Sequence, residues 1–145
     1  MGVMNGSAGF ALDARLQRDS IAVGELALCR LLLMRNADYP WFVLVPRRAD
    51  VTELHHLPIA QAVQLLEESR ALSAAMAAAF VPRCLNVAKL GNVVEQLHLH
   101  HVARVPEDPA WPGPIWGRAA ARLHDPRSAD AVITRLLGHL TLPLC

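Results

Sequence analysis

Two histidines, His98 and His100, alternate with leucines in the stretch 96–104. If this stretch runs as a β-strand, its side chains point alternately to the two faces of a sheet. His98 and His100 then share one face with Gln96 and Val102, while His101 takes the other face. Two neighbouring imidazoles on a rigid strand support either nucleophilic attack by a neutral imidazole or capture of a metal ion.

A metal site is one way to interpret the pair. His98 and His100, followed by Glu107, loosely resemble the ligand spacing of cupins. However, Glu107 lies beyond residues that end the strand, and cupins consist of β-strands, whereas this chain contains a long Ala-rich helical stretch at 58–80. The adjacent histidines at 55–56 have no cysteine or carboxylate cluster nearby. We therefore expect neither a metal ion nor a cofactor.

A nucleophilic imidazole has different requirements. It must be neutral, exposed on the sheet face, and oriented by a hydrogen bond from its second nitrogen, for which a strand supplies backbone carbonyls. An ordinary histidine pKa of about 6.5 leaves most of the side chain neutral at cytoplasmic pH. The spacing of His98 and His100 alone does not separate this role from that of buried histidines with satisfied hydrogen bonds.

Length and composition indicate one compact domain. The chain has 145 residues, of which 53% are hydrophobic and 5% aromatic, so Leu, Val and Ala dominate the core. We expect a single domain over 10–145, with 1–9 as a loose leader and 105–145 forming a Trp/Pro loop and a C-terminal helix. Part of the apolar excess is expected to form a subunit interface.

Charge and cysteine content exclude several classes of partner. The net charge is +1, and 13 arginines and one lysine are scattered along the chain, so we expect no nucleic-acid partner. The three cysteines lack the spacing of a disulfide framework or zinc site, which favours a reducing compartment. The apolar stretch 71–81 is too short to cross a bilayer, and the start of the chain does not resemble a signal peptide. We expect a cytoplasmic protein without a membrane partner.

The order of elements predicts an α+β fold. The nearly continuous apolar run 21–34 suits a buried strand, with a short edge piece broken at Gly24, and a turn at 35–40 joins it to a strand at 41–46. Apolar residues three and four apart predict a helix over 58–80. A strand at 84–89 and the histidine strand then form a second antiparallel pair. Residues 10–16 suggest a short strand or turn.

The C-terminal part holds a loop and a helix. Residues 106–117 contain four prolines with Trp111 and Trp116, which predicts an ordered loop. We expect this loop to plug the core or contact a dimer partner, with a lid over a ligand as the alternative. Ser128 is the expected cap of a last helix that extends to Leu140. The predicted fold is thus an antiparallel sheet of about five strands with one long and one short helix.

The stretch 96–104 resembles the histidine triad family, whose motif is His-φ-His-φ-His-φ-φ, where φ is apolar. The resemblance extends over about 10–104. It implies an α+β dimer that binds nucleoside phosphates and transfers or hydrolyses nucleotidyl groups through a covalent nucleotidyl-histidine. The family's nucleophile falls on His98. Its third histidine falls on His100, which would contact the phosphate or the bridging atom of the leaving group.

Four positions depart from the family pattern. Gln96 replaces the first histidine, although an amide could still hold a neighbouring imidazole. Phe42 falls near an additional early histidine of many relatives. Asn36 matches only approximately the polar residue that binds the ribose hydroxyls. His101 replaces an apolar residue, and we expect it to face away from His98 with incomplete hydrogen bonds, so that His101→Val leaves stability level or raises it.

These observations lead to one functional hypothesis with two alternatives. We expect a hydrolase or transferase acting at the α-phosphorus of dinucleoside polyphosphates or nucleoside phosphoramidates, with a purine nucleotide as ligand, and a homodimer. The alternatives are a nucleotide-binding protein with little turnover and a His-rich metal-binding domain. The expected catalytic residues are His98 and His100. The expected substrate-binding residues are Asn36, Asn92, Val94 and Gln96.

Overall fold

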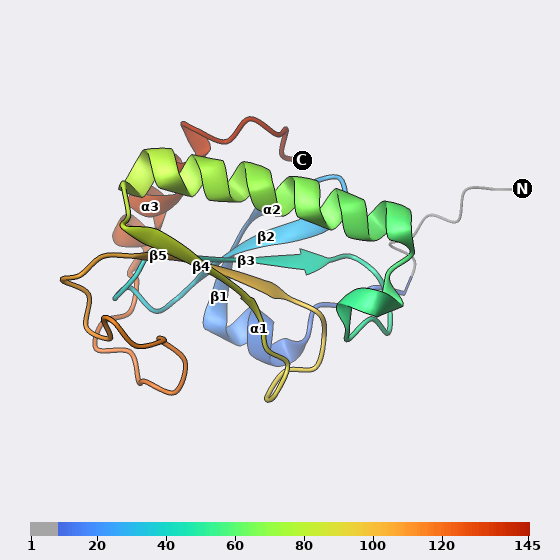
Figure 1. The fold of residues 1–145 in the computed structure, drawn as a ribbon, viewed down its shortest axis with the longest axis horizontal. Coiled ribbons are helices and arrows are strands. Elements are labelled where there is room, and N and C mark those ends of the chain that lie inside the picture. The colour runs from blue at the N-terminus through green and yellow to red at the C-terminus, as the bar shows by residue number, and fades with distance from the viewer. Residues whose placement is uncertain (1–8) are drawn as a thin grey trace, which may run out of the picture.

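The computed structural model describes residues 9–145 (Figure 1). The expected leader therefore lies outside the described residues, apart from Gly9. The elements follow in the order α1 (Ala14–Asp19), β1 (Ser20–Glu25), β2 (Cys29–Met34), β3 (Trp41–Pro46), a 3-10 turn (Leu54–His56), α2 (Ile59–Phe80), β4 (Cys84–Lys89), β5 (Leu99–Arg104) and α3 (Pro126–Leu137). Within this part of the chain, no helix is both long and apolar enough to cross a bilayer.

The five strands form one sheet in the order β1-β2-β3-β5-β4, and every neighbouring pair is antiparallel. This confirms the predicted α+β class and strand number. The prediction of one main strand over 21–34 is wrong, because β1 and β2 are two strands joined by a tight turn in which the Leu26 N–H donates to the Cys29 carbonyl. The sequence did not reveal this turn, because strands that are covered on both faces lack alternating apolar and polar residues. Gly24 marks a bulge in β1.

The N-terminal segment also differs from its prediction. Ala14–Asp19 is a helix rather than a strand or turn. The Asp13 carboxylate caps it by accepting a hydrogen bond from the Arg15 N–H. At the other end of the chain, α3 begins at Pro126 and is capped by Asp125, whereas Ser128 occupies the third helical position and bonds back to the Asp125 N–H.

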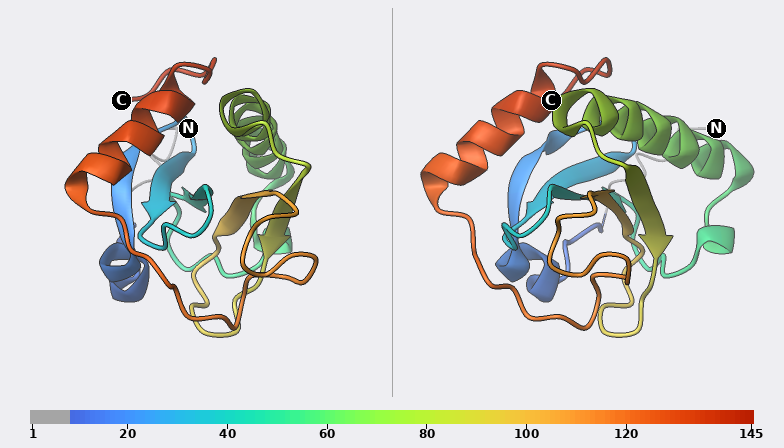
Figure 2. Two further views of the ribbon diagram at one scale, coloured as in Figure 1. Left: turned by 90° about the vertical axis from the view of Figure 1, so that its left-hand side faces the viewer. Right: turned by 60° about the vertical axis from the view of Figure 1, so that its left-hand side comes forward.

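The two faces of the sheet are covered by different elements (Figures 1 and 2). The helices α2 and α3 lie over one face, while α1 and the long connections lie along the other. The larger core joins α2 and α3 to alternate strand residues such as Leu31, Phe42 and Ala103. A smaller cluster joins Leu16 of α1 to residues such as Val43 on the opposite face.

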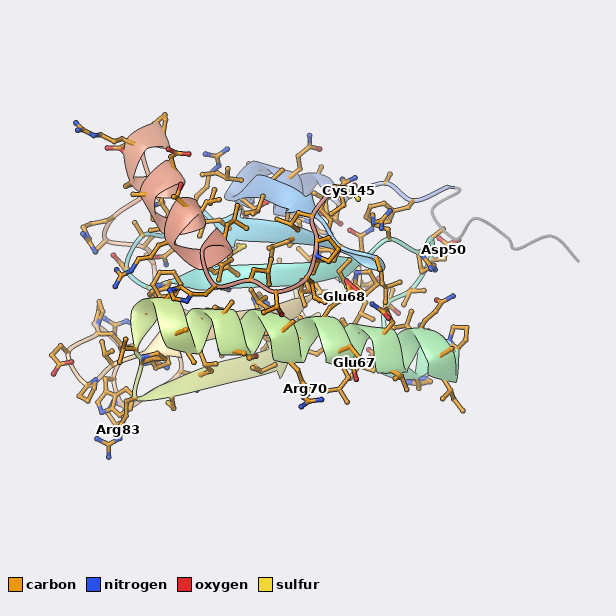
Figure 3. All side chains as sticks on the ribbon, turned by 90° about the horizontal axis from the view of Figure 1, so that it is seen from above. Asp50, Glu67, Glu68, Arg70, Arg83 and Cys145 are labelled. Carbon is orange, nitrogen blue, oxygen red and sulfur yellow. The ribbon has the colours of Figure 1, made fainter. Side chains whose placement is uncertain are left out.

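The long helix α2 packs as predicted along one stripe. Its buried residues include Leu65, Leu72 and Met76. Glu68 of this helix is charged and yet fully buried, and it accepts hydrogen bonds from the backbone N–H groups of Leu28 and Cys29 at 3.1 and 2.9 Å. Figure 3 shows Glu68 apart from Glu67 and Arg70, which project on the β4 side of the helix. Glu68 thus fixes the β1–β2 turn against α2, because a buried carboxylate requires such partners.

Candidate active site

A cavity of about 500 Å³ opens on the sheet face that carries α1. The histidine pair stands in its wall, next to residues from α1, from β3 and from the two loops on either side of β5. Its lining consists of Arg15, Leu16, Asp19, Met34, Trp41, Leu90, Gly91, Asn92, Val93, Val94, His98, His100, Trp116 and Gly117. The cavity therefore combines an apolar wall with a small number of polar groups, as ligand sites typically do.

His98 lies directly before β5 and has a defined orientation. Its Nδ1 lies 2.7 Å from the backbone carbonyl of Gln96. Because a carbonyl oxygen only accepts hydrogen bonds, Nδ1 carries the proton, and the lone pair of the neutral ring resides on Nε2. Burial lowers the pKa of His98 below its ordinary value, although the bond to Gln96 acts in the opposite direction. The ring is thus held as a neutral base.

His100 stands beside it, with a distance of 4.7 Å between the two ring centroids. The indole Nε1–H of Trp41 donates a hydrogen bond to Nδ1 of His100 at 3.0 Å. Burial, with the neighbouring His98 and His101 adding to it, lowers the pKa of His100 to about 3. The two imidazoles are therefore neutral at pH 7, and Nε2 is the remaining nitrogen of each ring, as a lone pair in His98 and as an N–H group in His100.

The predicted substrate-binding residues divide into two groups. Asn92 and Val94 line the cavity, in the loop before β5. The Gln96 side chain forms its hydrogen bonds away from the imidazoles, because it accepts from the Asp13 N–H and donates to the Ala11 carbonyl, each at 2.8 Å. Gln96 acts on His98 through its backbone carbonyl, while its amide ties the N-terminal segment to the site.

Asn36 does not line this cavity. Its side-chain oxygen accepts from the Asp38 N–H at 2.8 Å, and the residue borders an adjoining hollow. Asp19 and Met34 line both the hollow and the main cavity. Asp19 is therefore a carboxylate at the site that the sequence did not single out.

The sequence did not single out two further residues of the site, Arg15 and Trp41. Arg15 lines the cavity and is held by the Asp13 carboxylate at 2.9 Å and by the Val93 carbonyl at 2.6 Å. Its role depends on the helix α1, which the sequence did not predict. Trp41 also lines the cavity, whereas Phe42, which falls near the early histidine of relatives, is fully buried on the α2 face. These two neighbours point to opposite faces of the sheet, and the pairing of β3 with β5 places Trp41, not Phe42, on the face of His100.

Trp116 joins the site from the loop after β5. Its ring centroid lies 5.3 Å from that of His100, and it lines the cavity. The expectation that the loop plugs the core is confirmed for Ile115, which is buried against Tyr39 and Val102. Trp116 itself lies at the cavity, which is the position that the alternative of a lid over a ligand describes. Arg104 and Asp108, a buried ion pair with a distance of 2.7 Å, hold the start of the loop.

His101 points to the opposite face, as predicted from regular alternation. The pairing of β5 with β3 and with β4 is continuous through His100 and His101. The Nε2 of His101 lies 2.7 Å from the Ser69 hydroxyl, and its Nδ1 lies 3.1 Å from the Leu99 carbonyl. Both ring nitrogens are therefore satisfied, and the expectation of incomplete hydrogen bonds is wrong.

This correction reverses the expected effect of His101→Val on stability. The substitution leaves the buried Ser69 hydroxyl without its partner, so we expect the free energy of unfolding to fall by roughly 1–3 kcal/mol. The double variant with Ser69→Ala should recover part of this loss. Single-turnover rates should remain near those of the wild type, because His101 does not reach the cavity. A large loss of rate in the folded variant would contradict the placement of His101.

The described residues, 9–145, contain no group of three or more His, Cys, Asp or Glu side chains positioned to hold a metal ion. In the same part of the chain, His55 and His56 stack edge to face on the 3-10 turn, with a distance of 4.7 Å between centroids. The Nδ1 of His56 instead accepts hydrogen bonds from the backbone N–H groups of Thr52 and Glu53.

Comparisons with known proteins agree with this geometry. The family model of the HIT domain matches residues 15–107. No curated protein sequence matches the chain. Three solved structures of histidine triad proteins are similar to it. One from Sinorhizobium meliloti is 38% identical, with 93% of this chain and 100% of that chain covered and a TM-score of 0.90.

The other two histidine triad structures are similar to the chain to about the same degree. A histidine triad protein from Marinobacter aquaeolei is 44% identical, with 90% of this chain and 96% of that chain covered and a TM-score of 0.87. One from Bradyrhizobium japonicum is 39% identical, with coverages of 90% and 98% and a TM-score of 0.87. Both the sequence and the fold thus agree with the motif at 96–104, and the chain belongs to the histidine triad (HIT) family.

Proposed function

We propose that the protein is a nucleotide hydrolase or nucleotidyl transferase that acts at the α-phosphorus through a covalent nucleotidyl-His98. The observation that carries this proposal is the orientation of His98. Its Nδ1–H is directed to the Gln96 carbonyl, and its Nε2 lone pair has no partner within residues 9–145. A neutral, oriented imidazole in a cavity of about 500 Å³ is suited to attack a bound phosphate ester or anhydride.

The other residues of the cavity have complementary roles in this reaction. We assign the apolar wall, which includes Leu16 and Met34, to the purine base, and the Arg15 guanidinium to the phosphate charge. To the backbone N–H groups near Asn92 and Val94 we assign the stabilisation of the charge that develops on the phosphate oxygens. Water then attacks the nucleotidyl-His98 and releases a nucleoside monophosphate. No metal ion is needed for the covalent step.

A trapping experiment tests this function. The protein is mixed with radiolabelled diadenosine tetraphosphate or adenosine phosphoramidate and quenched with base within milliseconds, since phosphoramidate bonds to histidine are acid-labile. We expect a burst of adenosine monophosphate and an adenylyl group on His98, located by peptide mapping. Stoichiometric nucleotide binding without adenylyl-protein or turnover would instead favour a nucleotide-binding protein. Stoichiometric zinc in place of nucleotide would favour a metal-binding domain.

The lowered pKa of His98 predicts an unusual acid limit of activity. Attack requires the neutral ring, and burial keeps this ring neutral below its ordinary pKa of 6.5. We therefore expect kcat/KM to stay level as the pH falls through 6.5 and to decline only at a lower pH. The measurement is a profile of kcat/KM between pH 4.5 and 8, about the range over which histidines titrate in proteins. A decline centred at or above the ordinary value would contradict the buried environment of His98.

We also propose that the protein is a homodimer. The strand β4 is an edge of the sheet and exposes Val87. The first half of α2 exposes Ile59, Val63 and Leu66, of which Ile59 is 84% exposed. An open strand edge and an exposed apolar stretch of helix are both features that a second copy of the chain can cover. We also include a cytoplasmic location in the proposal. The three cysteines form no disulfide, which is compatible with such a location.

The dimer predicts a specific mass and a specific way to disrupt it. Light scattering at micromolar concentration should give twice the chain mass of 15.8 kDa. Val63→Asp should shift the mass toward the monomer, because it places a charge in the apolar patch. The matched control, Arg127→Asp on α3, should leave the mass unchanged. A wild-type mass near that of one chain would refute the dimer.

A further inference from the structure

Trp41 occupies a defined place next to the catalytic pair. It is the first residue of β3 and pairs with Val102 of β5, so its side chain is directed to the same face as His100. The centroids of the Trp41 and His100 rings lie 5.6 Å apart, and the indole Nε1–H donates to Nδ1 of His100 at 3.0 Å. Trp41 therefore contacts the imidazole through one directed hydrogen bond.

This bond determines where the proton of His100 lies. An indole N–H can only donate, so Nδ1 of His100 must accept and carries no proton. In a neutral ring the proton then resides on Nε2, which has no hydrogen-bond partner within residues 9–145 and is not among their buried unpaired polar atoms. Trp116 packs edge-on against both His100 and Trp41, with centroid distances of 5.3 and 6.4 Å, and restrains the ring.

Among the described residues, 9–145, no other side chain that lines the cavity is suited to donate a proton. The titratable groups that line it are Arg15, Asp19, His98 and His100. Hydrogen bonds from Arg18 lower the pKa of Asp19, so this carboxylate is ionised near neutral pH, and the pKa of Arg15 is raised by Asp13. The single proton of neutral His98 is directed to the Gln96 carbonyl. The leaving group thus receives a hydrogen bond from His100 but no proton from a strong acid.

We propose that Trp41 is a positioning residue that holds His100 as a neutral Nε2–H donor, so that the site prefers leaving groups that depart as anions. Phosphoanhydrides, such as dinucleoside polyphosphates, are then better substrates than phosphoramidates, whose nitrogen must be protonated to leave as an amine. This inference rests on the proposed function of His98. It assigns to Trp41 a role that does not involve contact with the reacting phosphorus.

The covalent step balances without proton transfer. The Nε2 lone pair of His98 forms a bond to the α-phosphorus, and the bond from phosphorus to the bridging oxygen breaks. The electron pair of that bond leaves with the departing phosphate, whose new oxyanion accepts the hydrogen bond from Nε2–H of His100. The imidazole of nucleotidyl-His98 carries the positive charge, which the Gln96 carbonyl stabilises through Nδ1–H. The oxygen of a water molecule later bonds to the phosphorus, the bond from phosphorus to Nε2 breaks and its electron pair returns to His98, and one proton of the water is released to solvent.

The test combines nitrogen NMR with kinetics. In protein labelled with nitrogen-15 on histidine, the chemical shifts of the wild type should show His100 unprotonated on Nδ1 and protonated on Nε2. Trp41→Phe retains an aromatic ring but removes the donor, so both tautomers should appear, and kcat for diadenosine tetraphosphate should fall at least about tenfold. The matched control, Trp116→Phe, should keep the wild-type tautomer. For the wild type, kcat/KM should be at least about tenfold higher for diadenosine tetraphosphate than for adenosine phosphoramidate.

Each opposite result overturns a stated part of the inference. A proton on Nδ1 of wild-type His100, or an unchanged tautomer in Trp41→Phe, would refute the role of Trp41. Equal or faster cleavage of the phosphoramidate would refute the leaving-group preference. If neither substrate adenylates His98, the proposed function itself fails and the preference with it, while the NMR measurement still decides the role of Trp41.

Discussion

His98→Asn is expected to reduce turnover by a factor on the order of 10⁴ or more, because an amide cannot form the covalent bond to phosphorus. Asn is similar in size to the part of the imidazole that contacts the Gln96 carbonyl, and its amide N–H can replace the Nδ1–H. The fold and the nucleotide affinity should therefore change little. Single-turnover kinetics and calorimetric titration with adenosine monophosphate measure the two quantities separately.

Two other histidine variants serve as comparisons for the rate of His98→Asn. His100→Ala should also lower the rate, but by less, since it removes a hydrogen-bond donor and not the nucleophile. His139→Asn, at an exposed histidine beyond α3, should leave the rate unchanged. More than about 1% residual activity in His98→Asn, against the expected factor on the order of 10⁴, would refute the assignment of His98. Loss of nucleotide affinity together with rate would indicate a structural role instead.

The histidine strand shows what a sequence pattern predicts well. Strand alternation placed His98 and His100 on one face and His101 on the other. The continuous register of β5 confirms the opposite faces of His100 and His101, and His98, directly before β5, lines the same cavity as His100. The spacing of apolar residues likewise predicted the extent of α2. Both predictions depend only on the local repeat of a strand or helix, which is fixed by the backbone.

The partners of these residues could not be predicted in the same way. Trp41 meets His100 across a separation of 59 positions, and Glu68 meets Cys29 across 39. Such contacts depend on the register between strands and on the rotation of a helix, neither of which the local pattern determines. A charged residue in a helix also suggests exposure, so the burial of Glu68 conflicts with the usual preference. The same reasoning explains why the role of Arg15 was missed.

The loop after β5 depends on one buried ion pair. The side chains of Arg104 and Asp108 are 3% and 4% exposed, and Arg104 also donates to Asn86 and to the Gly113 carbonyl. Asp108 in turn accepts from the backbone N–H groups of Ala110 and Trp111. These bonds hold the backbone of residues 110–113 against Arg104 and Asp108, and the loop then continues to Trp116 in the cavity wall.

Asp108→Ala is therefore expected to lower the free energy of unfolding by about 3–5 kcal/mol, because it leaves the Arg104 charge buried without its partner. Asp108→Asn should cost less, since the amide oxygen can still accept from backbone N–H groups. Glu25→Ala, which breaks partly exposed pairs with Arg30 and Arg47, should cost less than Asp108→Ala and serves as the matched control. Urea unfolding at pH 7 measures all three.

The pH dependence of this stabilisation has a definite sign. Burial alone would raise the pKa of Asp108, but hydrogen bonds from Arg104 and from backbone N–H groups outweigh it and hold the pKa below the ordinary 3.8. The contribution is therefore present above the pKa of the unfolded chain and is lost as the pH falls through the lower pKa of the folded state. The difference in stability between wild type and Asp108→Ala should be level near pH 7 and shrink below about pH 4. A difference that grows toward low pH would contradict an ionised Asp108.

Because the same loop carries Trp116 against His100, Asp108→Ala should also slow turnover under conditions where the protein remains folded.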